Sequence, residues 1–195
     1  MQLTEHDITR KLQEHLKEFI MNALTNLYLQ DYAIIKNPTG THIYEPSLTA
    51  RIAMHLHEQL KHNEYNIDFE LATNAGYRVD CEYNKDGSLE KLDQNNSERR
   101  PDILLHKRAI HTFGSGYRTS AENILFCEVK WGALSKDDKK KLEYMADKYQ
   151  YYCSLGIDHI TGDGIKLVFR FVNNDDQVQT EEYKWDAENQ KLVKR

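Results

Sequence analysis

Proline, glycine and cysteine are all scarce in this chain of 195 residues, which contains 3 Pro, 9 Gly and 3 Cys. So few Pro and Gly residues exclude a collagen-like or low-complexity chain. The three cysteines, Cys81, Cys127 and Cys153, are odd in number, and no two of them are close in sequence. Zinc sites and disulfide frameworks use closely spaced or paired cysteines, so the sequence predicts free thiols in a reducing cytoplasm.

Long hydrophobic runs are also missing. No stretch approaches the roughly 18 consecutive apolar residues of a membrane-spanning helix, so we expect no membrane insertion. The opening residues MQLTEHDITR lack the basic and apolar regions of a signal peptide. In contrast, 12 Tyr, 6 Phe and 2 Trp are too many aromatic residues for a fully disordered chain. The length fits one domain, or one domain with an added helix.

The charge of the chain is unevenly distributed. A net charge of -5 disfavours a nucleic-acid partner when it is taken alone. However, residues 99–118 contain five basic residues and one acid, and residues 130–141 contain five lysines and two acids. The segment 175–188 is acidic instead, with six acids and one lysine. Basic charge is therefore concentrated in the middle of the chain, and this distribution matters more than the sum.

Hydrophobic periodicity predicts an α/β arrangement around a mixed sheet. Helices are expected over 4–30, from about 45 to 62, and over 137–155, with a break at 37–40 and with Gly156 ending the last helix. Strands are expected at 65–71, 77–83, 103–106, 124–130 and 165–172, and 180–185 is expected to pair with the last of them. Residues 86–99 and 107–122 are expected to be loops. The helix over 4–30 either packs on the domain or forms a dimer contact.

Charged residues follow the apolar start of the strand expected at 124–130. Residues two apart share a face of a strand, so Glu128 and Lys130 lie on one face with Phe126. Asp102 opens a neighbouring strand, and α/β folds collect their sites at such strand ends. Adjacent carboxylates repel unless a cation lies between them, and hard oxygen ligands suit Mg²⁺ or Mn²⁺. A lysine beside such a metal orients a water or stabilises charge on a phosphate. On their own, Glu128 and Lys130 also fit a surface ion pair.

A third carboxylate, Glu45, begins the second expected helix. At roughly 100° per residue it falls among Leu48, Ile52 and Leu56, within the apolar stripe. A carboxylate on a buried helix face needs a partner, so Glu45 is the helix carboxylate that we expect near the metal. The alternative is an acid of the first turn that interacts with the helix dipole. Glu58 falls on the solvent face.

Pro101-Asp102, followed after a gap by Glu128-Val129-Lys130, resembles the motif of the PD-(D/E)XK nuclease superfamily. The resemblance covers about residues 45–172 and implies a restriction-endonuclease-like α-β-β-β-α-β core with a mixed central sheet. It divides the chain into an N-terminal helical appendage (1–40) and a nuclease-like domain (41–195). The positions that match the family's catalytic and metal-binding site are Glu45, Asp102, Glu128, Val129 (through its carbonyl) and Lys130. The gap after Asp102 is long, and the N-terminal helix is not part of the family core.

The resemblance implies a metal-dependent nuclease that uses Mg²⁺ or Mn²⁺ and acts on DNA. The three acids hold the metal, and Lys130 positions the attacking water. The residues expected to contact the nucleic-acid backbone are Arg100, Lys107, Arg108, Lys136 and Lys139. The superfamily fold also occurs in proteins that do not cut, so the alternative is a non-catalytic nucleic-acid-binding or assembly module. A homodimer or a partner protein fits an enzyme that cuts both strands.

Several residues near the expected site fit two roles. His106 is either a base or phosphate contact, or a hydrogen-bonded structural histidine. Asp80 and Glu82 are expected on a solvated strand face, with Glu82 as a second-rank site candidate. The lysines at 139–141 form either a solvated helix face or phosphate contacts. Trp131 is either part of the core or a wall beside the substrate.

Overall fold

The computed structural model describes residues 5–36, 45–61, 77–82, 85–86, 89–92, 98, 100–107, 123–171 and 178–195. The break expected at 37–40, the strand at 65–71 and most of the loop at 107–122 lie outside the described residues. None of the described helices is both long and apolar enough to cross a membrane.

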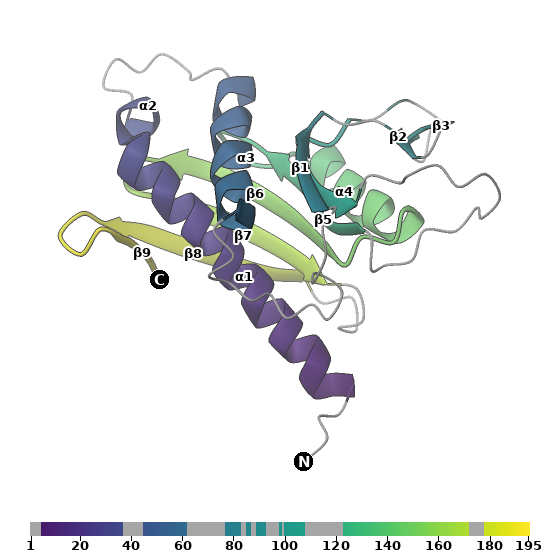
Figure 1. The fold of residues 1–195 in the computed structure, drawn as a ribbon. Coiled ribbons are helices and arrows are strands. Elements are labelled where there is room, and N and C mark those ends of the chain that lie inside the picture. The colour runs from purple at the N-terminus through teal and green to yellow at the C-terminus, as the bar shows by residue number, and fades with distance from the viewer. Residues whose placement is uncertain are drawn as a thin grey trace.

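The described residues form a mixed α/β structure with a seven-stranded mixed sheet (Figure 1). The helices are α1 (Glu5–Gln30), α2 (Tyr32–Lys36), α3 (Glu45–Lys61) and α4 (Lys136–Lys148). The strands of the sheet are β1 (Tyr77–Cys81), β4 (Ile103–Lys107), β5 (Asn123–Val129), β6 (Cys153–Thr161), β7 (Gly164–Phe171), β8 (Val178–Asp186) and β9 (Lys191–Lys194). Two short strands, β2 (Lys85–Asp86) and β3 (Leu89–Glu90), pair with each other separately.

The strands of the sheet follow the order β1-β4-β5-β6-β7-β8-β9. Strands β5 and β6 are parallel, and every other neighbouring pair in this sheet is antiparallel. Parallel neighbours cannot be joined by a tight turn, and here α4 provides the crossover between them.

Helices cover both faces of the sheet (Figure 1). α1 and α3 pack on one face, where Phe19 and Ile52 join Leu125 and Leu155 in the main core. α4 packs on the other face with the residues Leu142, Met145, Ala146, Leu104, Phe126 and Tyr151. From Leu16 onward, the apolar stripe of α1 is therefore buried within its own chain, and α1 contacts α3. The division of the chain at residue 40 and the expected homodimer or partner protein stay predictions.

The structure confirms most of the expected elements with small changes at their ends. α1, α3, β4, β5 and β7 lie where periodicity places them, and β8 pairs with β7. β1 ends at Cys81, before the expected end, because Glu82 has a positive φ of 49° that leaves the extended conformation. The strands β2 and β3 fall inside the segment expected to be a polar loop, and β9 was not expected from the sequence.

The prediction of a helix over 137–155 is wrong for the second half of this segment. α4 ends at Lys148, and the chain turns at Gln150, which adopts a left-handed φ of 52°. The N–H of Tyr151 then donates to the carbonyl of Ala146, at 3.0 Å, which closes the helix end. Gly156 does not end a helix but lies inside β6, a strand buried on both faces. A continuous apolar run of this kind has no period of two, so it is easily taken for a helix.

Candidate functional site

Asp102 and Glu128 lie next to each other across β4 and β5. Ile103 is opposite Cys127 in this antiparallel pair, and the following positions along the same register are Asp102 and Glu128. Leu104 and Phe126, two residues away on each strand, pack under α4, so both carboxylates belong to the α4 face of the sheet. The register therefore brings together two acids that are 26 residues apart in the sequence.

Asp102 is held by the backbone of the neighbouring strand end. The N–H of Val129 donates to Oδ2 of Asp102 at 2.7 Å. Burial raises the pKa of Asp102, although this hydrogen bond and the charges of Lys141 and Lys130 oppose the rise. The side chain is thus fixed in position and remains a poorly solvated charge.

Glu128 is the most deeply buried acid of the expected site, with a side chain that is only 3% exposed. Nζ of Lys141 forms an ion pair with Oε1 at 2.5 Å, and among the described residues this oxygen has no further partner. Burial raises the pKa of Glu128 to about 7, and the neighbouring charge of Asp102 adds to the rise, while Lys141 opposes it. One ion pair therefore does not compensate for the burial of this charge.

Glu45 and Lys130 meet at the end of β5. Oε2 of Glu45 lies 3.1 Å from Nζ of Lys130, and Oε1 accepts a longer hydrogen bond of 3.4 Å from the N–H of Trp131. Burial lowers the pKa of Lys130, but the hydrogen bond and charge of Glu45 outweigh it, so the pKa is raised overall. Trp131 packs against the main core, as the core interpretation requires.

The expectation that Glu45 lies on a buried face needs a correction. Its side chain is 41% exposed, because it is the first residue of α3, where the apolar stripe has not yet entered the core. Glu45 therefore reaches the site from the end of the helix. At this position it can both interact with the helix dipole as an acid of the first turn and contact the site residues.

The donor atoms of this cluster suit a hard divalent cation. Carboxylate oxygens of Asp102 and Glu128 are ligands that Mg²⁺ and Mn²⁺ prefer, and burial makes both acids favour a nearby positive charge. As the side chains lie, no group of three or more His, Cys, Asp and Glu residues within the described ranges is arranged to hold a metal ion. Two of the acids have lysine partners instead, since Glu45 is paired with Lys130 and Glu128 is paired with Lys141. The two strand acids fit a metal, whereas Glu45 would have to turn away from Lys130 to join them.

Lys141 is the site residue that sequence reasoning missed. The sequence presents it only as one member of the lysine run at 139–141. A signal was present, because Lys141 lies four residues before Met145, on the helix face that α4 buries. A lysine on a buried helix face needs an acidic partner, and Glu128 provides it.

His106, Asp80 and Glu82 lie near the expected site, and His106 and Asp80 form a pair with a structural role. His106 is fully buried, and its Nε2 lies 3.0 Å from Oδ2 of Asp80. Asp80 therefore does not lie on a solvated strand face as expected, since its side chain is only 10% exposed. Glu82 is exposed. This pair favours the interpretation of His106 as a hydrogen-bonded structural histidine.

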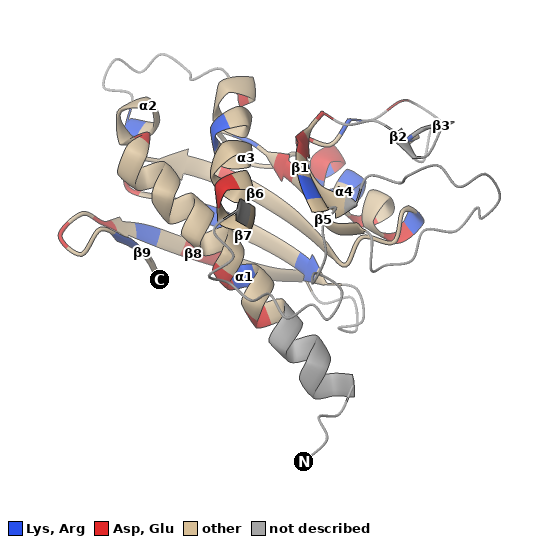
Figure 2. Ribbon diagram, viewed as in Figure 1, with Lys and Arg blue, Asp and Glu red and all other residues tan. Residues whose placement is uncertain are grey.

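The structure describes some of the residues that were expected to contact nucleic acid. Arg100, Lys136 and Lys139 are exposed, and the two lysines lie on α4, which carries both signs of charge (Figure 2). The carbonyl of Arg100 accepts a hydrogen bond of 3.0 Å from Nζ of Lys141, so Arg100 lies close to the acids. Arg108 and the side chain of Lys107 lie outside the described residues.

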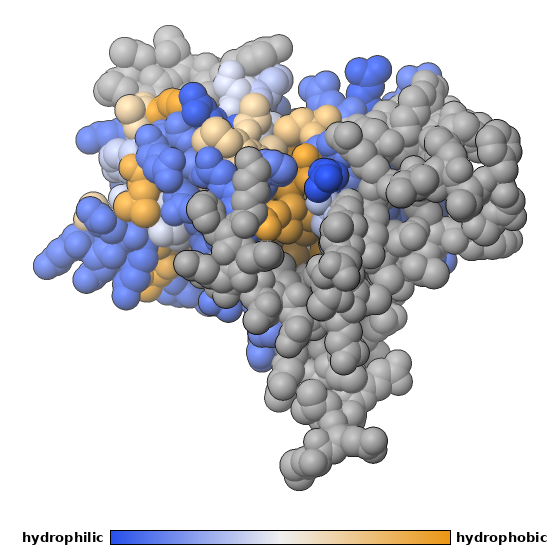
Figure 3. All heavy atoms as spheres, viewed as in Figure 1, coloured by the Kyte–Doolittle hydropathy of each residue, from blue (hydrophilic) through white to orange (hydrophobic). Residues whose placement is uncertain are grey.

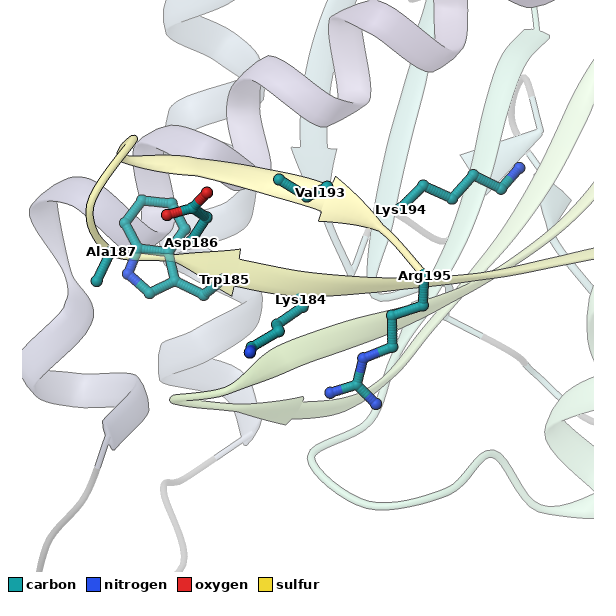
Figure 4. Close-up of a pocket in the computed structure, with 7 residues that line it drawn as sticks. All are labelled: Lys184, Trp185, Asp186, Ala187, Val193, Lys194 and Arg195. Carbon is teal, nitrogen blue, oxygen red and sulfur yellow. The ribbon is translucent and has the colours of Figure 1, made fainter.

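Hollows on the surface lie at the other end of the sheet. One of about 460 Å³ is lined by residues of β8 and β9, among them Lys184, Trp185 and Arg195 (Figure 4). Hydrophilic side chains cover much of the face seen in Figure 3, including the β8–β9 hairpin. The site acids do not line this hollow. It therefore does not add to the carboxylate site.

Comparison with known proteins adds no relative: no family model matches the chain, and neither the curated proteins nor the solved structures contain a significant match.

Proposed function

We propose that this protein is a metal-dependent nuclease that hydrolyses phosphodiester bonds of DNA. The observation that carries the proposal is the meeting of Glu45, Asp102, Glu128 and Lys130 at one end of β5. These residues come from α3, the start of β4 and the end of β5. Carboxylates that can bind a divalent cation, with a lysine beside them, are the groups that metal-assisted phosphate chemistry uses.

The order of the elements supports a restriction-endonuclease-like core. Apart from the separate β2–β3 pair between β1 and β4, the order α3, β1, β4, β5, α4 and β6 gives a helix, three antiparallel strands, a crossover helix and a strand parallel to the third. This is the α-β-β-β-α-β order that the resemblance implies. Free thiols at all three cysteines support the expected cytoplasmic location.

Each residue of the site has a distinct part in the proposed reaction. Asp102 and Glu128 would hold the metal, together with the carbonyl of Val129. A divalent cation supplies charge neutralisation on the phosphate and a more acidic water. Glu45 orients the Lys130 ammonium through their 3.1 Å contact, and Lys130 positions the attacking water or stabilises charge on the phosphate. Arg100, Lys136 and Lys139 would hold the DNA backbone.

A non-catalytic nucleic-acid-binding or assembly module is the second candidate. The observation in its favour is that lysines already pair with Glu45 and Glu128, so the described residues neutralise these acids without a metal. A protein that has lost catalysis would keep such pairs for stability alone.

A cleavage assay separates the two candidates. Purified protein is incubated with supercoiled plasmid, linear duplex, single-stranded DNA and RNA, each with Mg²⁺, Mn²⁺ or EDTA. Lys130→Ala and Asp102→Ala are the test variants, and Lys184→Ala, at the far end of the sheet, is the matched control. We expect metal-dependent cleavage of DNA by the wild type and the control, and none by the test variants. Equal behaviour of all four proteins on every substrate would favour the binding module.

A further inference from the structure

The ammonium of Lys141 lies where the two strand acids need a positive charge. Its Nζ is 2.5 Å from Oε1 of Glu128. Lys130 is paired with Glu45 instead, so the two lysines of the site serve different acids.

Lys141 is held in this position from three directions. Nζ donates to the carbonyl of Arg100 at 3.0 Å, pairs with Glu128, and lies 5.9 Å from the centre of the Phe126 ring. Its side chain is only 16% exposed, whereas Lys140, next to it on α4, is exposed. A lysine that is only part of a solvated helix face would not be enclosed in this way.

A divalent cation bound by Asp102 and Glu128 would need the oxygen that Lys141 now contacts. The ammonium and the metal are both cations, so they cannot share this position without strong repulsion. In the metal-free protein, in turn, removal of Lys141 would leave the buried carboxylate of Glu128 without its ion pair, beside the second acid Asp102. Either the Lys141 ammonium or the divalent metal therefore has to occupy the position beside Glu128.

We propose that Lys141 is an internal counter-ion, which occupies the cation position of the site in the metal-free protein and is displaced when a divalent metal binds. The inference rests on the proposed function, because it concerns the metal site of the proposed nuclease. It gives the site a regulatory property: the apparent metal affinity is set by competition between Lys141 and the metal. The protein also needs no metal to keep a positive charge beside Glu128 in the folded state.

Chemical labelling of lysines tests the displacement directly. The full-length protein is treated with an acetylating reagent in EDTA and in saturating Mn²⁺, and the rate at each lysine is measured by mass spectrometry. We expect slow labelling of Lys141 in EDTA and a rate several-fold higher with Mn²⁺, since the released ammonium becomes accessible. Lys140 is the internal control, and its rate should be the same in both conditions.

Metal affinity provides the second measurement, by calorimetric titration of Mn²⁺ into each variant. Lys141→Met should bind Mn²⁺ at least about fivefold more tightly than the wild type, because the competing cation is gone. Lys141→Arg, which keeps the charge, should return the affinity toward the wild-type value, and Lys140→Met should not change it.

The outcomes separate this inference from the function on which it rests. Mn²⁺ binding by the wild type with unchanged labelling of Lys141, or without tighter binding by Lys141→Met, overturns the counter-ion and leaves the nuclease proposal intact. Absence of Mn²⁺ binding in the wild type and in Lys141→Met overturns both.

Discussion

Two buried glutamates in the same sheet, Glu128 and Glu181, show opposite electrostatic behaviour. Both have side chains that are less than 10% exposed, and both lie beside lysines. Burial raises the pKa of both, but at Glu181 the hydrogen bonds from Lys17, Tyr183 and Lys194 outweigh it and lower the pKa to about 2. At Glu128 burial prevails, and the pKa rises to about 7.

The number of partners explains the difference. Oε1 of Glu181 lies 2.7 Å from Nζ of Lys17 and 2.9 Å from Nζ of Lys194, and Oε2 accepts from the hydroxyl of Tyr183. Glu128 has one ion pair and a second acid beside it. A carboxylate with a complete set of partners stabilises the fold, whereas a buried acid with too little positive charge around it is ready to bind a cation.

The largest expected effect is on catalysis. Asp102→Asn should lower the rate of DNA cleavage by roughly 100-fold or more, because it removes a carboxylate that we propose as a metal ligand and keeps the shape of the side chain. Glu181→Gln should cleave DNA within about twofold of the wild-type rate per folded molecule. Initial rates on plasmid in Mg²⁺ measure both, with the folded fraction checked by circular dichroism. An equal loss of cleavage rate in both variants would show that Asp102 and Glu181 do not differ in function.

Stability should change in opposite directions in the two regions. Glu181→Gln should lower the free energy of unfolding by about 1–2 kcal/mol, since charge-assisted hydrogen bonds to Lys17 and Lys194 are lost. Glu128→Gln combined with Lys141→Met should raise it by about 1 kcal/mol in EDTA at pH 8, because the double change replaces a buried ion pair and leaves neither charge without its partner. Urea unfolding monitored by fluorescence measures both. A destabilised double variant would mean that the Lys141–Glu128 pair stabilises the fold.

The pH dependence of stability should separate the two acids again. The pKa of Glu128 is raised from 4.5 to about 7, so in EDTA its contribution favours folding at low pH and declines as the pH rises through this range. The pKa of Glu181 is lowered from 4.5 to about 2, so its contribution is present above pH 4.5 and is lost as the pH falls toward 2. Melting temperatures from pH 3 to pH 8 measure both effects.

Matched variants identify the source of each slope. Glu128→Gln should flatten the decline between about pH 5 and pH 8, and Glu181→Gln should weaken only the loss in acid. If the melting temperature of Glu128→Gln still declines above pH 5, a group other than Glu128 is responsible for the decline.

The smallest expected effect concerns DNA binding at the two ends of the sheet. Each of Lys136→Ala and Lys139→Ala should weaken binding a few-fold at low salt and reduce the slope of log affinity against log salt by about one unit. Lys184→Ala and Lys191→Ala, near the β8–β9 end, should leave both values unchanged. Fluorescence anisotropy in Ca²⁺ in place of Mg²⁺ at several salt concentrations measures this. Equal losses at both ends would place the DNA on the whole face of the sheet.

Sequence reasoning identified those parts of the fold that depend on local patterns. The amphipathic stripes of α1 and α3 and the apolar run of β5 are readable because they repeat with a helical period or fill a buried strand. The end of α4 was not readable, because its left-handed residue is Gln150 rather than glycine, and β6 continues as an apolar run. The C-terminal boundary of α4 thus depends on tertiary packing and not on a local stop signal.

The sequence predicted the acids of the candidate site, but it did not predict which residue pairs with each acid. The motif places Asp102, Glu128 and Lys130 at strand ends, and their register follows from antiparallel pairing. The partner of each acid depends on how α3 and α4 pack on the sheet, which no spacing along the chain encodes. For this reason the Lys141–Glu128 pair and the exposure of Glu45 became clear only in three dimensions.

Crystals grown with Mn²⁺ would test the central claim most directly, because anomalous diffraction locates the metal without any assumption about activity. The account predicts an anomalous peak between the carboxylates of Asp102 and Glu128, with the Lys141 ammonium moved away from Glu128. Mn²⁺ bound elsewhere, or a fully occupied Lys141–Glu128 ion pair in crystals at saturating Mn²⁺, would contradict it.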